Sequence, residues 1–334
     1  MKEPFLLVPV GKYRIWGGHR LNDEYNKNID IQKLGETWEC STHPDGMSTA
    51  ASGCYKGRTL NSILIENPEF MGSNPLDIIP ERLVKNGELP ILVKFIDADS
   101  DLSVQVHPDD AYAAQNENGQ LGKTEMWYVA DAGRDAKLVY GLNRDIDRDT
   151  LKKSIIGGTL EKHLQKVNVK TDDVFFVPSG TIHAVGKGAL IAEIQENSDL
   201  TYRLYDYDRI DRDGKKRELH IDKALDCACL KASKTPVQPM RVLKYKNGWA
   251  SELLCRCRYF NVERILLNTE RQKQMVTFAT SSLSFAVMLC MKGCGTVIYK
   301  NGMLPFFKGD CIFVPAGIDG IKVHGTAQLL KVSC

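Results

Sequence analysis

The sequence predicts a mainly β protein in which short helices interrupt sandwiches or barrels of strands. Most apolar runs span only five to seven residues and end at glycine, proline, aspartate or asparagine, which is typical of strands. Helical patterns are few and stand between these runs. The chain has 334 residues, 43% hydrophobic and 26% charged, so it can bury a large core without disulfides or structural metals.

The predicted strands follow one another at short intervals through the first two thirds of the chain. They cover Ile91–Ile96, Leu102–Val106, Met126–Ala130, Lys137–Gly141, Asp173–Val177 and Ala189–Gln195. Apolar periodicity and capping residues predict helices over Leu60–Ile65, Asp109–Gln115, Arg148–Ile156 and Ile221–Leu230. Helical insertions are therefore expected at about residues 55–75 and 145–165.

A segment with two prolines divides the chain. Residues 231–240, KASKTPVQPM, are typical of a linker, so one domain is expected over 1–235 and a second over 240–334. GDCIFVPAGIDG, which begins at residue 309, repeats the pattern of DDVFFVPSGTIHAVG, which begins at residue 172. Each copy runs from a strand into a Pro-x-Gly turn, after which the first has His183 and the second Gly320. This repeat predicts two related β units, the second without a metal site.

Charge and cysteine content exclude several classes of protein. The 44 basic and 42 acidic side chains leave a net charge of +2, which argues against nucleic-acid and membrane-surface partners. The longest uncharged stretch, residues 274–291, contains a Thr-Ser-Ser turn and is interpreted as two strands rather than a membrane helix. Ten cysteines without an export signal favour reduced thiols and a cytoplasmic location.

Four candidate metal ligands lie on or beside three predicted strands. The segment DLSVQVHP alternates strictly, so its serine, glutamine and histidine project from one face. A glutamate lies at the start of the strand within GKTEMWY, and a second histidine follows the first Pro-x-Gly turn. Two imidazoles, a carboxylate and an amide oxygen suit Zn²⁺ or a similar divalent ion. The candidate ligands are Gln105, His107, Glu125 and His183.

Charged residues accompany these ligands. Lys94 lies on the preceding strand, and Lys123 neighbours the candidate glutamate ligand. The segment EIQENSDLTYR adds the carboxylate of Glu193 and the guanidinium of Arg203. Cations beside a metal indicate a phosphorylated or otherwise anionic substrate. By contrast, the run DYDRIDRDGKKR at residues 206–217 predicts a solvated hairpin around Asp-Gly.

Several motifs together resemble one known family. SVQVHP, GKTEMWY, PSGTIHA and ENSDLTYRLYDYDR, in this order and spacing, are similar to type I mannose-6-phosphate isomerases of the short bacterial form. WGG and GETWECSTHP nearer the N-terminus fit the same family. The resemblance is strong over about residues 5–220 and looser beyond. It implies two cupin-type (jelly-roll) β-barrels with short helical insertions, the second barrel lacking a metal site.

The resemblance also implies a reaction and roles for the candidate residues. The chain is expected to interconvert mannose 6-phosphate and fructose 6-phosphate through a cis-enediolate, with one Zn²⁺ per chain on the four ligands. Arg203 corresponds to the family's catalytic arginine. The base stays open among Glu193, Lys123 and a water on the metal. Substrate-binding positions correspond to Lys94, Ser103 and Arg209, although Arg209 stands where the family has lysine.

Two other functional classes fit part of this set. A cupin that binds sugar phosphates without turnover would have no need of an oxyanion stabiliser such as Arg203. An iron-dependent cupin oxygenase would use two histidines and a carboxylate. The lysines and serine beside the ligands favour an anionic sugar instead. The sequence leaves the oligomeric state open, a homodimer included.

Overall fold

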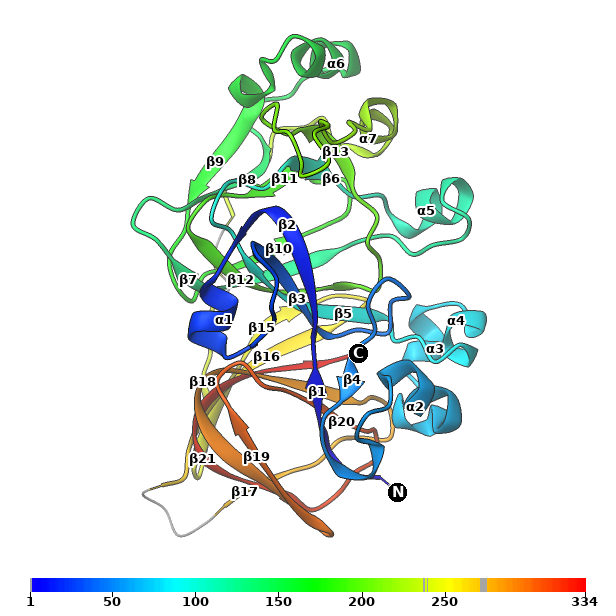
Figure 1. Cartoon of the computed structure of the whole chain (residues 1–334), viewed down its shortest axis with the longest axis vertical. Coiled ribbons are helices and arrows are strands. Elements are labelled where there is room, and N and C mark those ends of the chain that lie inside the picture. The colour runs from blue at the N-terminus through cyan, green and yellow to red at the C-terminus, as the bar shows by residue number, and fades with distance from the viewer. Residues whose placement is uncertain (1, 237, 239, 271–274) are drawn as a thin grey trace.

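Three β-sheets are stacked along the long axis of the molecule (Figure 1). The computed structural model describes residues 2–236, 238, 240–270 and 275–334. A five-stranded sheet lies at one end, a six-stranded sheet in the middle and a ten-stranded sheet at the other end. The prediction of a mainly β fold with helical insertions is confirmed.

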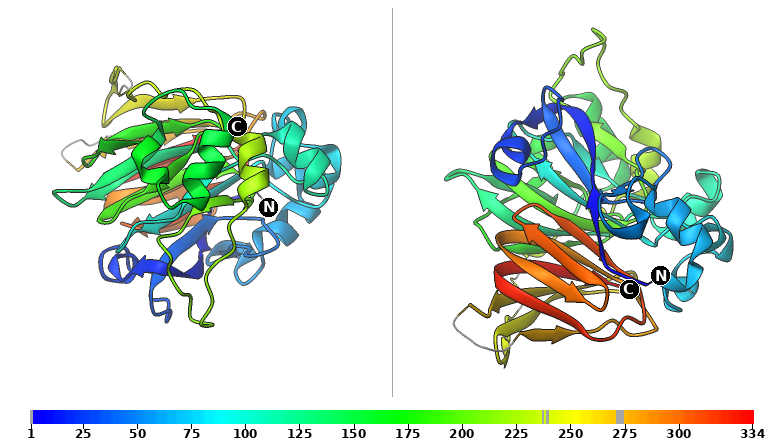
Figure 2. Two further views of the ribbon diagram at one scale, coloured as in Figure 1. Left: turned by 90° about the horizontal axis from the view of Figure 1, so that it is seen from above. Right: turned by 60° about the horizontal axis from the view of Figure 1, so that its bottom comes forward.

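The ten-stranded sheet joins the two ends of the chain. Its C-terminal strands are β14 (Lys244–Lys246), β15 (Trp249–Arg256), β16 (Asn261–Asn268), β17 (Val276–Phe278), β18 (Ala286–Tyr299), β19 (Gly302–Phe307), β20 (Cys311–Val314) and β21 (Ile321–Ser333). β1 (Phe5–Val8) pairs antiparallel with both β20 and β4 (Thr49–Ala50), so N-terminal strands extend this sheet. The expected boundary near residues 235–240 thus separates two parts that share one sheet. Figure 2 shows that the long strands of this sheet are strongly curved.

The other two sheets face each other and enclose the candidate ligands. The six-stranded sheet contains β2 (Val10–Gly18), β3 (Leu34–Cys40), β5 (Ile91–Asp97), β7 (Glu125–Ala132), β10 (Val174–Val177) and β12 (Ala189–Glu196). The five-stranded sheet contains β6 (Val104–Val106), β8 (Lys137–Leu142), β9 (Leu164–Asn168), β11 (His183–Val185) and β13 (Tyr202–Tyr205). Apolar side chains of both sheets form one buried cluster, which includes Trp127, Val129, Leu138 and Val185.

Most of the helices cover one side and one end of the stack, whereas α1 lies on the opposite side (Figures 1 and 2). They are α1 (Arg20–Tyr25), α2 (Leu60–Glu66), α3 (Pro75–Ile78), α4 (Glu81–Lys85), α5 (Asp110–Asn116), α6 (Arg148–Ile156) and α7 (Ile221–Cys227). Thr59, Asp109 and Asp147 are the N-caps of α2, α5 and α6. The side chain of each accepts the backbone N–H of the third residue of its helix. The first insertion reaches α4, beyond the expected residue 75, because Pro75 and Pro80 start two more short helices.

Most predicted elements agree with the structure to within two residues, the usual uncertainty at element ends. The predicted helix from Ile221 ends earlier, at Cys227, because the N–H of Cys229 donates instead to the Gly180 carbonyl at 2.8 Å. The uncharged stretch contains β17 and the start of β18, as predicted, although residue 274 lies outside the described part of the chain. No helix among the described residues has the length and apolar character that a bilayer crossing requires.

Both copies of the Pro-x-Gly repeat form the same local structure. β10 and β20 each end directly before the proline, and the glycines Gly180 and Gly317 have φ of 82° and 69°. This left-handed backbone is the conformation that glycine permits at little cost. In the first copy the turn leads into β11, whose first residue is His183.

Phe5 anchors β1 to the C-terminal core. Its fully buried ring lies 5.4 Å from the ring centroids of both Tyr55 and Phe313. Because truncation would leave a cavity, we expect Phe5→Ala to lower the free energy of unfolding by about 3–5 kcal/mol. Val8→Ala, on the same strand but half exposed, should change it by less than about 0.5 kcal/mol. Urea unfolding measures both, and equal stability of the two variants would contradict the anchoring role.

Candidate active site

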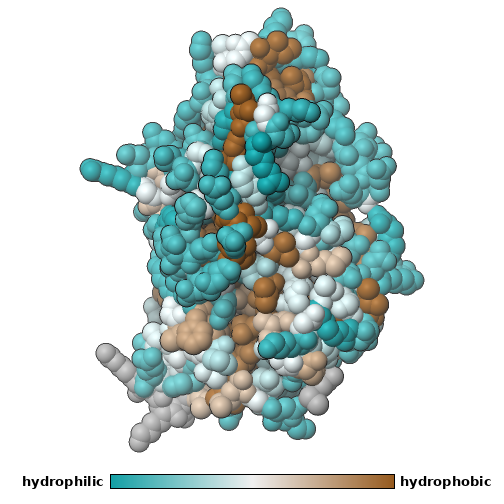
Figure 3. All heavy atoms as spheres, in the orientation of Figure 1, coloured by the Kyte–Doolittle hydropathy of each residue, from teal (hydrophilic) through white to brown (hydrophobic). Residues whose placement is uncertain are grey.

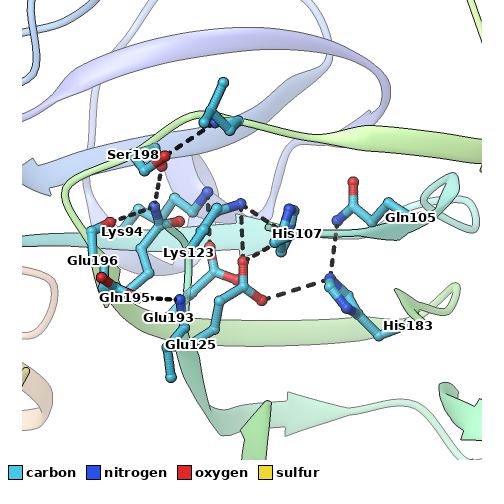
Figure 4. A network of polar contacts seen from close by, with 12 residues as sticks. Lys94, Gln105, His107, Lys123, Glu125, His183, Glu193, Gln195, Glu196 and Ser198 are labelled. Atoms are coloured by element: carbon cyan, nitrogen blue, oxygen red, sulfur yellow. Dashed lines mark hydrogen bonds and ion pairs between the residues drawn. The ribbon is translucent and has the colours of Figure 1, made fainter. Parts of the chain in front are cut away.

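The structure brings all four predicted ligands together between the two facing sheets (Figure 4). Ligand atoms of His107, Glu125 and His183 lie within 4.8 Å of one another, and these side chains are only 1% exposed. β11 pairs antiparallel with β6 so that His183 stands opposite Gln105, while Glu125 is the first residue of β7. The Gln105 amide nitrogen is 3.3 Å from His183 Nε2.

The unsatisfied polar atoms of this group fit a cation. His107 Nδ1 and Glu125 Oε2 are buried without a hydrogen bond, while Glu125 Oε1 has only the close ion-pair contacts to His107 Nε2, at 3.0 Å, and Lys123 Nζ. His183 Nδ1 lies 2.9 Å from the Thr181 carbonyl, which leaves Nε2 free to face the cluster. Burial, then the charge of Lys123, lowers the pKa of His107 to about 3, and burial lowers the pKa of His183 as well. Both imidazoles are therefore neutral, as metal ligands must be.

Lys123 lies among the same ligands. Its Nζ is 2.9 Å from Glu125 Oε1 and 3.2 Å from His107 Nε2. Burial alone would raise the pKa of Glu125, but the nearby Lys123 charge holds it well below its usual range. Glu125 is thus an ionised carboxylate that can hold a divalent ion.

A second charged group stands beside the first. Lys94 Nζ is 2.7 Å from Glu193 Oε2 and 3.8 Å from Glu36 Oε2. The indole N–H of Trp127 donates to Glu193 Oε1 at 2.6 Å, which fixes the orientation of this carboxyl group. Burial, then the negative charge of Glu125, raises the pKa of Glu193 to about 7. A carboxyl group with that pKa can accept a proton near neutral pH.

A cavity of about 370 Å³ opens onto these groups. Its walls include most of the predicted site residues, namely Lys94, Ser103, Gln105, Lys123, Glu193 and Arg203. His107, Glu125 and His183 are not among the wall residues, but the wall residues Gln105 and Lys123 contact His183 and Glu125 directly. On the face of the molecule in Figure 3, the upper part is largely hydrophilic, and hydrophobic residues are scattered over the rest.

Arg203 lies in the cavity wall, and its guanidinium is held by two contacts. Its Nε is 3.4 Å from Ser103 Oγ, and Nη1 donates to the Glu218 carbonyl at 2.8 Å. Burial, followed by the charge of Arg217, lowers the pKa of Arg203 from its very high ordinary value. A guanidinium keeps its charge at any physiological pH. The side chain therefore presents a fixed positive charge to the cavity.

Arg209 is not among the wall residues. Its guanidinium donates to the carboxylate of Asp206 at 2.6 Å and lies over the ring of Tyr207. Asp206 also binds Arg217, which does line the cavity together with Asp211. The hairpin predicted to be solvated at residues 206–217 thus contributes these two residues to the cavity wall.

Two further wall residues, Arg14 and Glu36, were not predicted from the sequence. Arg14 Nε lies 2.7 Å from Glu36 Oε1, and the Trp38 indole donates to Glu36 Oε2 at 2.8 Å. Burial alone would raise the pKa of Glu36, but the charges of Arg14 and Lys94 pull it far below its usual range. The available signal was the alternation of Glu36 and Trp38, which places both side chains on one face of β3.

Comparison with known proteins identifies the family. Residues 5–141 match the family model of the phosphomannose isomerase type I catalytic domain, and residues 251–334 match that of the mannose-6-phosphate isomerase cupin domain. The probable mannose-6-phosphate isomerase GmuF of Bacillus subtilis is 46% identical over 332 residues, 99% of each chain. The chain belongs to the type I phosphomannose isomerase family. The resemblance seen in its motifs is confirmed.

Other members of the phosphomannose isomerase family match along their whole length. The mannose-6-phosphate isomerase of Streptococcus mutans is 42% identical over 99% of this chain and 98% of its own. A crystal structure of the mannose 6-phosphate isomerase from Bacillus subtilis superimposes with a TM-score of 0.88 and 36% identity, covering 100% of both chains. A variant of phosphomannose isomerase from Salmonella typhimurium, 16% identical, shares the fold with a TM-score of 0.71.

Proposed function

We propose that this chain is a metal-dependent aldose–ketose isomerase that interconverts mannose 6-phosphate and fructose 6-phosphate. The observation that carries this proposal is the buried His107–Glu125–His183 group next to a cavity whose wall presents Glu193 and Arg203. Relatives named as mannose-6-phosphate isomerases over their full length support the same reaction.

We propose one Zn²⁺ per chain, held by His107, Glu125 and His183, with Gln105 as a weaker fourth ligand. Nitrogen and carboxylate ligands in a closed, buried site suit this borderline ion. When bound, the ion would polarise the sugar carbonyl and offset the negative charge that develops on it. Neutral imidazoles and an ionised Glu125 are the protonation states that such binding needs.

The residues of the chain supply proton transfer and charge stabilisation. The reaction moves a proton between C1 and C2 through a cis-enediolate, so a base must reach both carbons. Glu193 is our first choice because its pKa is raised to about 7 and Trp127 fixes its orientation. Lys123 and a water molecule are the other candidates. Arg203 would stabilise the enediolate oxygen with its fixed positive charge.

Substrate binding is assigned to the cations and hydroxyl of the cavity wall. Lys94 and Ser103 would bind the phosphate group and thereby hold the reacting carbons in place. Arg209 would act less directly, because its guanidinium binds Asp206, the carboxylate it shares with the wall residue Arg217. Substitution of any of these three residues is therefore expected to raise KM more than it lowers kcat.

We also propose two cupin-type jelly-roll barrels, with a catalytic domain over 1–235 and a degenerate barrel over 240–334. Gly320 after the second Pro-x-Gly turn supports the absence of a metal site from the second barrel. Among the described residues, the only group of three ligands close enough for a metal lies in the first. All ten cysteines are unpaired, which fits a cytoplasmic protein. A homodimer stays a prediction for sedimentation to test.

A coupled assay that reports fructose 6-phosphate tests the proposed function. We expect turnover of mannose 6-phosphate by metal-loaded protein, little turnover of unphosphorylated mannose, and loss of turnover after chelation. Tight binding of mannose 6-phosphate without turnover would instead indicate the non-catalytic cupin. Oxygen consumption that depends on Fe²⁺ would indicate the oxygenase.

The raised pKa of Glu193 predicts the pH dependence. A base must be ionised, so kcat/KM should fall as the pH drops below about 7. Glu193→Gln cannot accept the proton, so we expect kcat to fall by about 10²–10⁴-fold and the acidic limb of the profile to disappear. Metal content should stay unchanged. If the acidic limb persists in this variant with little loss of kcat, the base is Lys123 or water.

A further inference from the structure

The loop that carries Lys123 connects α5 to β7. We call residues 121–124 the lysine loop. Its next residue, Glu125, is a proposed metal ligand, and Lys123 itself reaches the ligands Glu125 and His107 at 2.9 and 3.2 Å. Any displacement of the lysine loop would therefore move a cavity-wall cation and a ligand together.

Asp110, the first residue of α5, holds the lysine loop from one side. Its Oδ1 accepts the backbone N–H of Gly122 at 2.9 Å. Gly122 packs so closely on the start of α5 that a Cβ there would lie 2.5 Å from the backbone nitrogen of Asp110. The lysine loop thus packs directly on the N-terminal end of α5, and the Asp110 side chain binds it there.

Glu196, at the end of β12, holds the lysine loop from the other side (Figure 4). Its Oε1 accepts the N–H of Thr124 at 2.7 Å. Burial, then the charge of Asp110, raises the pKa of Glu196 to about 8, so its carboxyl group carries a proton at neutral pH and adds no second charge beside Asp110. The two N–H groups that flank Lys123 are therefore both bound by acidic side chains.

The second oxygen of Asp110 is bound from the C-terminal part of the chain. Tyr259 lies in the turn between β15 and β16 of the ten-stranded sheet. Its hydroxyl donates to Asp110 Oδ2 at 2.9 Å. A continuous path of hydrogen bonds therefore runs from Tyr259 through Asp110 to the N–H of Gly122, beside Lys123.

From these contacts we propose that Tyr259 and Asp110 are positioning residues, through which the C-terminal sheet holds Lys123 and Glu125 in the geometry that the reaction needs. The catalytic half of this inference rests on the proposed function. The C-terminal part, which carries no metal-ligand group of its own among the described residues, would thus complete the active site from outside the cavity.

Tyr259→Phe tests the proposal because it removes the hydroxyl and keeps the ring. A displacement of about 1 Å in a catalytic group can cost 10²-fold, so for this indirect contact we expect kcat to fall by about 5–20-fold at saturating Zn²⁺. KM should change by less than about 2-fold, because the phosphate-binding Lys94 and Ser103 lie on other elements. Tyr245→Phe, on the exposed strand β14, is the matched control and should behave as wild type.

Two further measurements separate positioning from a purely structural role. Asp110→Asn combined with Tyr259→Phe should lower kcat by less than the product of the two single effects, because both act on one path. Hydrogen–deuterium exchange of a peptide covering residues 119–125 should be faster in Tyr259→Phe than in wild type.

The proposal is overturned if Tyr259→Phe keeps both the kcat and the exchange rate of wild type. Faster exchange with an unchanged kcat would overturn it too, since the contact would then serve the fold alone. If the wild-type protein does not isomerise mannose 6-phosphate, the proposed function fails. Exchange in the lysine loop then still decides whether Tyr259 holds it.

Discussion

His183→Ala should remove the metal and, with it, the isomerase activity. His183 offers Nε2 to the metal-ligand group while its Nδ1 is fixed by the Thr181 carbonyl, and among the described residues no third histidine belongs to this group. Loss of a supporting contact alone usually costs 10–100-fold in metal affinity, so we expect loss of this ligand to cost at least about 100-fold. Metal analysis after dialysis, together with the coupled assay, measures both effects.

His324→Ala provides the matched control for that loss. His324 is an exposed histidine on β21, in the part of the chain expected to bind no metal. It should leave metal content and activity as in wild type. Equal metal content in His183→Ala and wild type would contradict the ligand assignment, and loss of metal in His324→Ala would place a metal in the C-terminal part.

Arg203→Ala should lower kcat by about 10²–10³-fold, the usual cost of removing one preorganised oxyanion stabiliser. KM should change far less, because the charge of Arg203 matters most where negative charge develops, in the transition state. Arg203→Lys should recover only part of the loss, since an ammonium cannot reproduce the contacts to Ser103 and Glu218 that fix the guanidinium. Steady-state kinetics of both variants measures this.

Arg209→Ala is the comparison for Arg203. Its guanidinium binds Asp206 off the cavity wall, so kcat should fall much less than in Arg203→Ala. An unchanged kcat with a raised KM in Arg203→Ala would make this arginine a substrate anchor. That result would leave the proposed isomerase activity unchanged, but the catalytic role assigned to Arg203 would be wrong.

Local pattern predicted much of the fold and part of the site. The strict alternation before Pro108 placed Gln105 and His107 on one face, and the Pro-x-Gly turn placed His183 at the start of a strand. That these residues meet Glu125 depends on two sheets facing each other, a long-range arrangement that periodicity does not encode. The chemistry of the four side chains made them candidate ligands of one metal, and the family resemblance then implied that they meet.

The site residues that were not predicted are positioned by contacts with residues far away in the sequence. Glu36 meets Lys94 because β3 and β5 are neighbours with Trp38 opposite Lys94. Turn chemistry predicted the hairpin at residues 206–217 but not that Asp211 and Arg217 line the cavity. In the same way, no local signal connects Tyr259 to Asp110, which lie 149 residues apart.

One metal ion per chain, held next to the cavity, is the basis of the proposed activity. Titrating metal-free protein with Zn²⁺ while following the conversion of mannose 6-phosphate measures this dependence directly. We expect no turnover without metal, a linear rise on addition and a plateau at one equivalent per chain. Full turnover by protein that contains no detectable metal would contradict this dependence on metal. So would the absence of turnover at every amount of added Zn²⁺.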